Sequence, residues 1–193
     1  MANTYTALHY HIIFSTKNRQ PWIIPDIEHR VWAFIGGIAR TYKMAALQVG
    51  GIEDHIHALV TAPPTIAAFQ IAQFLKGESS KWIHEEFAAL RHFGWQDGYG
   101  AFTVSKSNIS EVISYIQNQR EHHRKKTFQE EYLDFLRKNG IEYNERYLWG
   151  DPLVKVDEPT RRSFSRRATI EFSPAFQGRE GVTKSAPPSR SDG

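Results

Sequence analysis

The 193-residue chain has no cysteine, only two methionines and no apolar run of the length that a membrane span requires. Without cysteine, disulfide bonds, thiolate zinc sites and cysteine nucleophiles are excluded. Any bound metal ion must therefore be held by histidine, aspartate, glutamate or glutamine. No long apolar segment follows basic residues near the first residue, so we expect no signal peptide and a cytoplasmic protein.

The net charge of +3 is small and unevenly distributed along the chain. Residues 154–193 contain eight Lys or Arg against five Asp or Glu, whereas residues 1–153 contain sixteen of each kind. A large basic excess is the usual mark of a nucleic-acid-binding domain, and here that mark is weak. Nucleic-acid binding therefore has to be argued from local clusters of basic side chains.

The most informative stretch is His55-Ile56-His57, which lies inside a short apolar run. The run is too short for a helix and favours a strand. Side chains alternate on a strand, so the two histidines share one face and Ile56 points to the core. Two imidazoles about 7 Å apart along a strand can converge on one divalent metal ion. Without further ligands, two structural histidines would explain the pattern equally well.

The periodicity of apolar residues predicts the order β-α-β-β-α-β followed by C-terminal helices, an α+β fold of the ferredoxin-like split βαβ type. The first and third strands are expected at the centre of the sheet, which leaves the face with the two histidines open. The predicted strands are residues 5–16, 45–49, 55–61 and 99–104. Helices are predicted from residue 25 to 42, from residue 65 with an interruption at 76–82, over 108–126 and over 128–138.

Three local signals set the boundaries of these elements. Gly50-Gly51 predicts a turn before the His55 strand, and Thr65 is expected to cap the second helix. Asn108 with Glu111 has the spacing of a capping box at the start of the third helix. From residue 151 onward Pro, Ser, Arg and Gly dominate, so we predict one domain over residues 1–150 and a basic, disordered tail over residues 151–193.

Tyr115 and Gln119 lie four residues apart on a predicted helix and therefore share a face. If this helix covers the open face of the sheet, Gln119 brings an amide oxygen to the histidine pair and Tyr115 brings a nucleophile. A His/His/Gln ligand set is neutral and leaves a metal ion strongly Lewis acidic. The alternative is a core tyrosine and a surface glutamine without a shared role.

Two rivals to this ligand set stay open. His122 lies on nearly the same helix face as Gln119 and is a second candidate for the third ligand. His9-Tyr10-His11 is another histidine pair on a strand, but its central residue is aromatic and no helix is predicted to accompany it. We interpret His11 as a neighbour of the site.

The ordered set of His55-Ile56-His57 and Tyr115-Ile116-Gln117-Asn118-Gln119 resembles the single-tyrosine HUH transposases of IS200-like insertion sequences and their REP-associated relatives. Further sequence segments at residues 11–19, 74–81 and 98–105 also resemble that family and occur in the same order. The likeness runs over residues 4–149 and leaves the tail uncovered.

The resemblance implies an enzyme that cleaves and rejoins single-stranded DNA containing hairpins, with Mg²⁺ or Mn²⁺ held by His55, His57 and Gln119. Tyr115 would attack a DNA phosphate, which forms a 5′-phosphotyrosine link and frees a 3′-OH without a nucleotide cofactor. Members of the family are typically homodimers. Phosphate contacts are expected from the basic residues Lys17, Arg19, Lys76, Lys81, Arg120 and Arg124, with His11 beside them.

Three other functions use some of the same residues. An HUH replication or mobilisation nickase would share the metal chemistry, although relaxases usually place the tyrosine before the histidine pair. A domesticated, non-catalytic nucleic-acid-binding protein would not need all four site residues. A metal-dependent hydrolase would use water in place of Tyr115.

Overall fold

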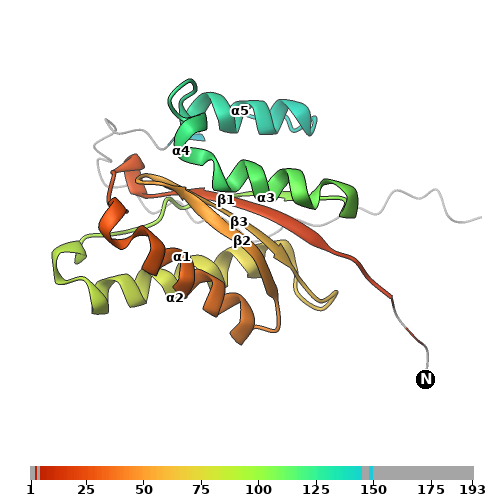
Figure 1. Ribbon diagram of the computed structural model, residues 1–193, viewed down its shortest axis with the longest axis horizontal. Helices are drawn as coiled ribbons and strands as arrows, with labels where there is room; N and C mark the ends of the chain where they lie inside the picture. The colour runs from red at the N-terminus through yellow and green to blue at the C-terminus, as the bar shows by residue number, and fades with distance from the viewer. Residues whose placement is uncertain (1–2, 4, 145–147, 150–193) are drawn as a thin grey trace, which may run out of the picture. The chain divides into compact units, whose positions relative to one another are not determined.

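A four-stranded antiparallel sheet with the order β2-β3-β1-β4 organises the fold. In the computed structural model, which describes residues 3, 5–144 and 148–149, the strands are β1 (His9–Ser15), β2 (Ala45–Ile52), β3 (His55–Thr61) and β4 (Gly100–Thr103). The first and third strands lie side by side at the centre (Figure 1). This order confirms the predicted ferredoxin-like split βαβ arrangement.

The helices lie on both faces of this sheet. α1 (Pro25–Thr41) and α2 (Ala68–Glu86) cover one face, and α3 (Ile109–Gln117), α4 (Gln119–His122) and α5 (Phe128–Lys138) lie on the other (Figure 1). Single 3₁₀ turns are found at Lys17–Arg19, Ala88–Leu90 and Lys106–Asn108. Among the described residues, no helix combines the length and apolar character needed to cross a membrane.

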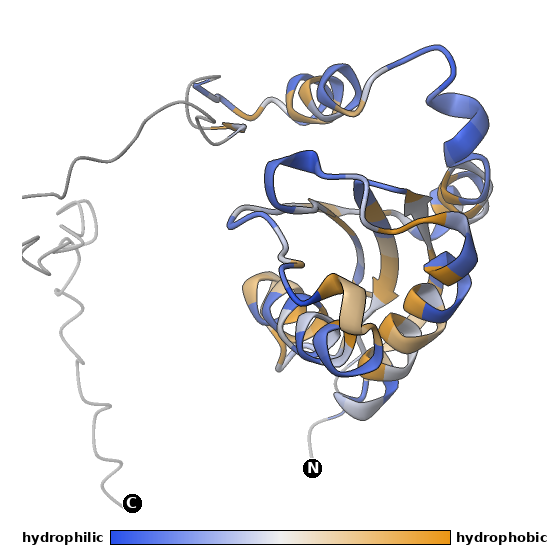
Figure 2. Cartoon of the chain, turned by 90° about the vertical axis from the view of Figure 1, so that its left-hand side faces the viewer, coloured by the Kyte–Doolittle hydropathy of each residue, from blue (hydrophilic) through white to orange (hydrophobic). Residues whose placement is uncertain are grey.

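The alternation of side chains on the central strands divides the interior into two parts. Ile12 and Phe14 of β1 and Ile56 of β3 pack against α1 and α2 in the larger core, whose apolar residues lie between helices and sheet in Figure 2. Ile13 points to the opposite face and joins a smaller cluster with Phe128 of α5. One face of the sheet is therefore sealed by apolar packing, and the other is left for polar side chains.

The structure corrects the predicted boundary between the second strand and the strand that begins at His55. Gly50 and Gly51 belong to β2 instead of a turn, and the chain reverses at Glu53-Asp54. Gly51 has a φ of +155°, and a Cβ there would lie 2.2 Å from the carbonyl oxygen of His55. Gly51 thus permits close approach of two strands, which a sequence pattern cannot distinguish from a turn.

The second helix begins later than predicted and is continuous. α2 begins at Ala68, after Ala67 and not at Thr65, and it runs without interruption through residues 76–82. Ser79 is buried inside it because its hydroxyl donates to the carbonyl of Leu75 and accepts from the indole N–H of Trp95. The small polar residues therefore mark a close contact, not a break.

The predicted third helix is divided at Asn118. Asn118 donates from Nδ2 to the carbonyl of Ser114 at 2.8 Å, which ends α3 before Gln119 opens α4. The capping box expected at Asn108 is absent, because Asn108 already has near-helical dihedrals within a 3₁₀ turn. The predicted tail, residues 151–193, lies outside the described residues, so the boundary at residue 150 stays a prediction.

Gly50 sets how closely α3 approaches the sheet, and replacing it tests that packing. A Cβ at Gly50 would lie 2.9 Å from Cγ2 and 3.0 Å from the carbonyl oxygen of Ile116. We expect Gly50→Ala to lower the free energy of unfolding by about 1–3 kcal/mol, because α3 must shift. Urea denaturation measures this change.

Gly77→Ala is the matched control. A Cβ at Gly77, on α2, meets nothing within 4 Å, so this change is expected to raise stability by about 0.5–1 kcal/mol. Wild-type stability of Gly50→Ala would show that α3 does not rest on β2 as described.

Candidate active site

β3 places His55 and His57 on the sheet face beneath α3, α4 and α5. Both side chains are fully buried, and their ring centroids are 5.1 Å apart. Ile56 between them lies in the core on the opposite face, as the alternation of side chains predicted. The strand therefore fixes the spacing of the two imidazoles.

Each histidine is oriented by a neighbour on its Nδ1 side. The Nδ1–H of His55 donates to Oδ1 of Asp54 at 2.7 Å, and Nδ1 of His57 lies 2.9 Å from Nε2 of His11. A ring whose Nδ1–H donates in this way is held in one tautomer and keeps a free lone pair on Nε2. Burial, followed by the proximity of other histidines, lowers the pKa values of His57 and His11 well below 6.5. The rings of His57 and His11 are therefore neutral, and the neutral imidazole is the form that binds metals.

Gln119 is the third predicted ligand, and the structure brings it to the pair. Its side chain is buried at the start of α4, and Oε1 lies 3.2 Å from Nε2 of His55. Nε2 of Gln119 donates to Oε1 of Glu131 at 3.1 Å, which orients the amide so that its oxygen faces the histidines. The break at Asn118 therefore does not separate Gln119 from the site.

Glu131 of α5 is a site residue that the sequence reasoning missed. It is 2% exposed, and its Oε2 lies 3.4 Å from Nε2 of His57 and 3.8 Å from Nε2 of His55. Burial raises the pKa of Glu131 to about 7, although His55 acts in the opposite direction. A signal was present, because an acidic residue between Phe128 and Phe135 interrupts the apolar stripe of the helix.

Three of these side chains bring their ligand atoms close enough together to hold one metal ion. His55, His57 and Glu131 each offer a ligand atom, and the three atoms lie within 4.8 Å of one another. Two ligand atoms at right angles around an ion with bonds of about 2.1 Å lie about 3 Å apart, close to the separations found here. Nε2 of His57 and Oε2 of Glu131 are buried without a hydrogen-bond partner. Lone pairs that face one another in this way repel, and a bound cation would relieve that repulsion.

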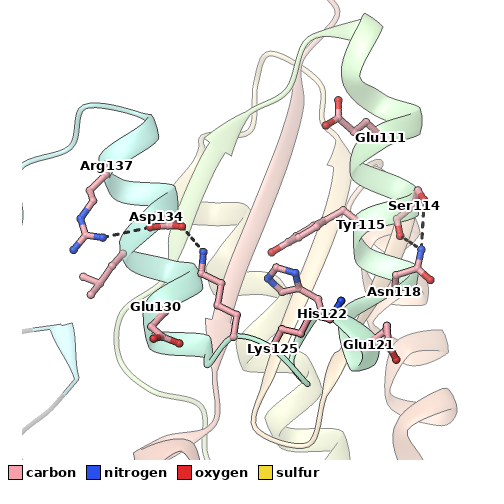
Figure 3. Close-up of a pocket in the computed structure, with 12 residues that line it drawn as sticks. Glu111, Ser114, Tyr115, Asn118, Glu121, His122, Lys125, Glu130, Asp134 and Arg137 are labelled. Carbon is pink, nitrogen blue, oxygen red and sulfur yellow. Dashed lines mark hydrogen bonds and ion pairs between the residues drawn. The ribbon is translucent and has the colours of Figure 1, made fainter.

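Tyr115 of α3 lies beside this cluster in the same chain. Its hydroxyl donates to Oε1 of Glu131, and its ring centroid lies 5.7 Å from that of His57 and 5.3 Å from that of His122. Figure 3 shows the Tyr115 ring extending from α3 towards α5, with His122 next to it. The hydroxyl is thus held next to the ligand atoms of the candidate metal site.

A pocket of about 1140 Å³ between α3, α4 and α5 gives access to Tyr115 (Figure 3). Its lining carries charges of both signs. Lys126 and Arg137 pair with Asp134, whereas Lys125 forms no ion pair with any residue that the structure describes. The candidate nucleophile therefore faces a space that a flexible ligand can enter.

The histidines that the sequence left open as alternative metal ligands contact other groups. His122 lies 3.5 Å from Glu131 and beside Tyr115, while His123 lies 3.0 Å from Oε1 of Gln119. Burial lowers both pKa values, that of His123 to about 4. His9 pairs with Thr61 at the far end of β1, so it does not join His11 in a second metal pair.

The predicted phosphate-binding residues are not gathered at the site. Lys76 and Lys81 lie on α2, across the sheet, and Lys76 donates to the carbonyls of residues 96–98. Arg120 pairs with Glu28 and Glu53, and Arg124 pairs with Glu121. Lys17 is exposed, and the guanidinium of Arg19 lies 5.7 Å from the centroid of the Trp149 ring. Their contacts with DNA stay predictions.

Comparison with known proteins gives consistent matches. A family model described as "Transposase IS200 like" matches residues 4–119. The transposase for insertion sequence element IS200 of Salmonella typhimurium is 30% identical over 127 residues, which cover 63% of this chain and 82% of that protein. The ISDra2 transposase TnpA of Deinococcus radiodurans is 24% identical over 119 residues, which cover 59% of this chain and 85% of that protein.

A solved structure agrees on the fold. The crystal structure of a candidate transposase from Deinococcus radiodurans matches with a TM-score of 0.51 and 24% identity, covering 62% of this chain and 95% of that chain. The range matched by the family model contains His55, His57 and Tyr115 and ends at Gln119, whereas Glu131 lies beyond it. The match spans more than half of the chain, and the chain therefore belongs to the IS200-like transposase family of DNA transposases.

Proposed function

We propose that this transposase cleaves and rejoins single-stranded DNA with the hydroxyl of Tyr115 as nucleophile, beside a metal ion bound by His55, His57 and Gln119. The observation that carries the proposal is the position of the Tyr115 hydroxyl. It is hydrogen-bonded to a carboxylate that itself faces the Nε2 atoms of both histidines. A nucleophile and a set of metal-ligand atoms on one side of a pocket are the arrangement that phosphoryl transfer requires.

The proposed metal is Mg²⁺ or Mn²⁺, which would supply positive charge to a phosphate oxygen when bound. The chain's own residues orient the ligands. Asp54 fixes the ring of His55, His11 fixes the ring of His57, and Glu131 fixes the amide of Gln119. Because the imidazole of His57 is buried and its pKa is lowered well below 6.5, it would present its Nε2 lone pair without first losing a proton.

The proposed reaction is a transesterification. The phenolic oxygen of Tyr115 bonds to phosphorus, and the bond from phosphorus to the 3′ oxygen breaks. Tyr115 loses its proton, and the departing 3′ oxygen takes one up from water, so charge and atoms balance. Each step exchanges one phosphodiester bond for another, which is why no nucleotide cofactor is needed. A later attack by a free 3′-OH on the tyrosine link would rejoin the strand.

Single-stranded DNA with hairpins is the proposed substrate, in keeping with the family. The Tyr115 hydroxyl lies against the buried Glu131, and a flexible strand can bend a phosphate into the pocket, whereas a rigid duplex cannot. Lys125 lines the pocket, has no ion pair with a described residue and can contact a phosphate of such a strand. A homodimer and a cytoplasmic location stay predictions.

A nickase and a non-catalytic binding protein are weaker candidates. Both would keep the sheet and some basic residues, but a binding protein would have no use for buried, unpaired ligand atoms beside a tyrosine. A hydrolase that uses water would leave Tyr115 without a role. The presence or absence of a covalent protein–DNA link separates these functions.

The orientation of His55 can be tested through metal affinity. We expect Asp54→Ala to weaken Mn²⁺ binding by about ten- to a hundredfold, because the imidazole loses the hydrogen bond that fixes its tautomer. Isothermal titration calorimetry on the full chain measures this. Glu53→Ala is the control, since its carboxylate pairs with Arg120 and does not contact His55. Equal losses in both variants would contradict the assigned role of Asp54.

The substrate can be tested by binding measurements with one sequence in two forms. We expect a single-stranded hairpin to bind more tightly than the same sequence as a perfect duplex, and log K to fall with log salt by about 0.7 per phosphate contact. Lys125→Ala should reduce that slope by about one contact. Equal affinity for hairpin and duplex would count against the proposed substrate.

The nucleophile can be tested by removing one oxygen atom. We expect Tyr115→Phe to fold and bind DNA as the wild type does but to form no covalent adduct and no cleaved strand, as seen on a denaturing gel with labelled DNA and Mn²⁺. Tyr143→Phe is the control, since its hydroxyl accepts a hydrogen bond from the exposed Arg137 and lies outside the candidate site. An adduct that survives in Tyr115→Phe would identify another nucleophile.

A further inference from the structure

Among the residues that the structure describes, Glu131 is the one carboxylate that contacts both the histidine pair and the candidate nucleophile. It lies on α5, beyond residues 4–119, which the family model matches. α5 is held in place by its own apolar contacts, since Phe128 and Leu136 pack with Ile13 and Phe102 of the sheet. The position of Glu131 is thus fixed by packing and does not depend on the polar site itself.

The two oxygens of Glu131 face different groups. Oε2 lies 3.4 Å from the Nε2 atoms of both His57 and His123 and 3.8 Å from Nε2 of His55, and no described residue donates a hydrogen bond to it. Oε1 accepts hydrogen bonds from the hydroxyl of Tyr115 and from the amide of Gln119. A buried carboxylate oxygen without a donor is costly unless it binds a cation.

The chemistry of the ions favours such a carboxylate. Mg²⁺ and Mn²⁺ are hard cations that prefer oxygen ligands and are usually bound by one or two carboxylates. His55, His57 and Gln119 together offer two nitrogens and one amide oxygen, with no negative charge. Glu131 would add the missing charge and a hard oxygen at a separation that suits cis ligands around one ion.

We propose that Glu131 completes the metal-ligand set with Oε2 and holds the Tyr115 hydroxyl next to that set with Oε1. This inference rests on the proposed function, because it assigns a residue to the same metal site and nucleophile. It makes α5 part of the active site. Glu131 is a ligand through one oxygen and a positioning residue for Tyr115 through the other.

The ligand role is tested by Mn²⁺ binding to the full chain without DNA, followed by the electron paramagnetic resonance signal of free Mn²⁺. We expect Glu131→Gln and Glu131→Ala to raise the Kd for Mn²⁺ at least about tenfold. Glu131→Gln keeps the side-chain volume, so it decides the matter if Glu131→Ala does not fold. Wild-type or tighter Mn²⁺ binding in Glu131→Gln would overturn the inference.

Two matched variants isolate the effect. Glu85→Gln makes the same change at an exposed position of α2, across the sheet, and is expected to leave Mn²⁺ affinity unchanged. Tyr115→Phe is also expected to keep wild-type Mn²⁺ affinity, because the phenol is not a ligand. His55→Ala provides the reference for a lost ligand.

The positioning role is tested at saturating Mn²⁺ and saturating hairpin DNA. We expect Glu131→Ala to form the Tyr115–DNA adduct at least about tenfold more slowly in a single turnover, with unchanged Kd for the DNA. A wild-type rate under these conditions would overturn the positioning role. If the wild type forms no adduct while Glu131→Gln loses Mn²⁺ affinity, the proposed nucleophile fails and the ligand assignment stands.

Discussion

The convergence of buried lone pairs between β3 and the helices above it is the constraint on which the rest of the structure depends. Nε2 of His55, Nε2 of His57 and Oε2 of Glu131 point at one place from a strand and from a helix 74 residues further along the chain. Leaving such atoms unpaired in the interior is costly, so a cation among them would stabilise this arrangement. The larger apolar core on the opposite face of the sheet packs against β3 and holds the strand that carries the two histidines.

The site is assembled from elements that are held independently. β3 fixes the positions of the two histidines. The close contact of Gly50 with Ile116 sets the distance between α3 and the sheet. The apolar face of α5 that contains Phe128 and Leu136 sets the position of Glu131. Each element brings one kind of group, and none of these contacts requires the metal. Functional groups held by rigid packing need little rearrangement during reaction, which is the basis of preorganised catalysis.

Several predictions from sequence failed for one physical reason. Gly50-Gly51, the polar stretch at 76–82 and Asn108 were interpreted as a turn, a break and a cap, because small and polar residues usually serve those purposes. In the structure Gly51 allows two strands to approach, Ser79 satisfies its hydroxyl within α2, and Asn108 is already near-helical. Local patterns do not record how closely another element approaches.

The sequence by itself determined the order of the elements, the face on which His55 and His57 lie, and the family, because alternation on a strand and a motif of fixed order are local properties. Only the tertiary structure decided which groups meet. Glu131 and His123 lie at the site, Gln119 and not His122 lies beside His55, and Arg120 pairs with Glu28 and Glu53. The break at Asn118 and the packing of α5 on the sheet set the directions of these side chains. Such long-range packing is not encoded by the local spacing of residues.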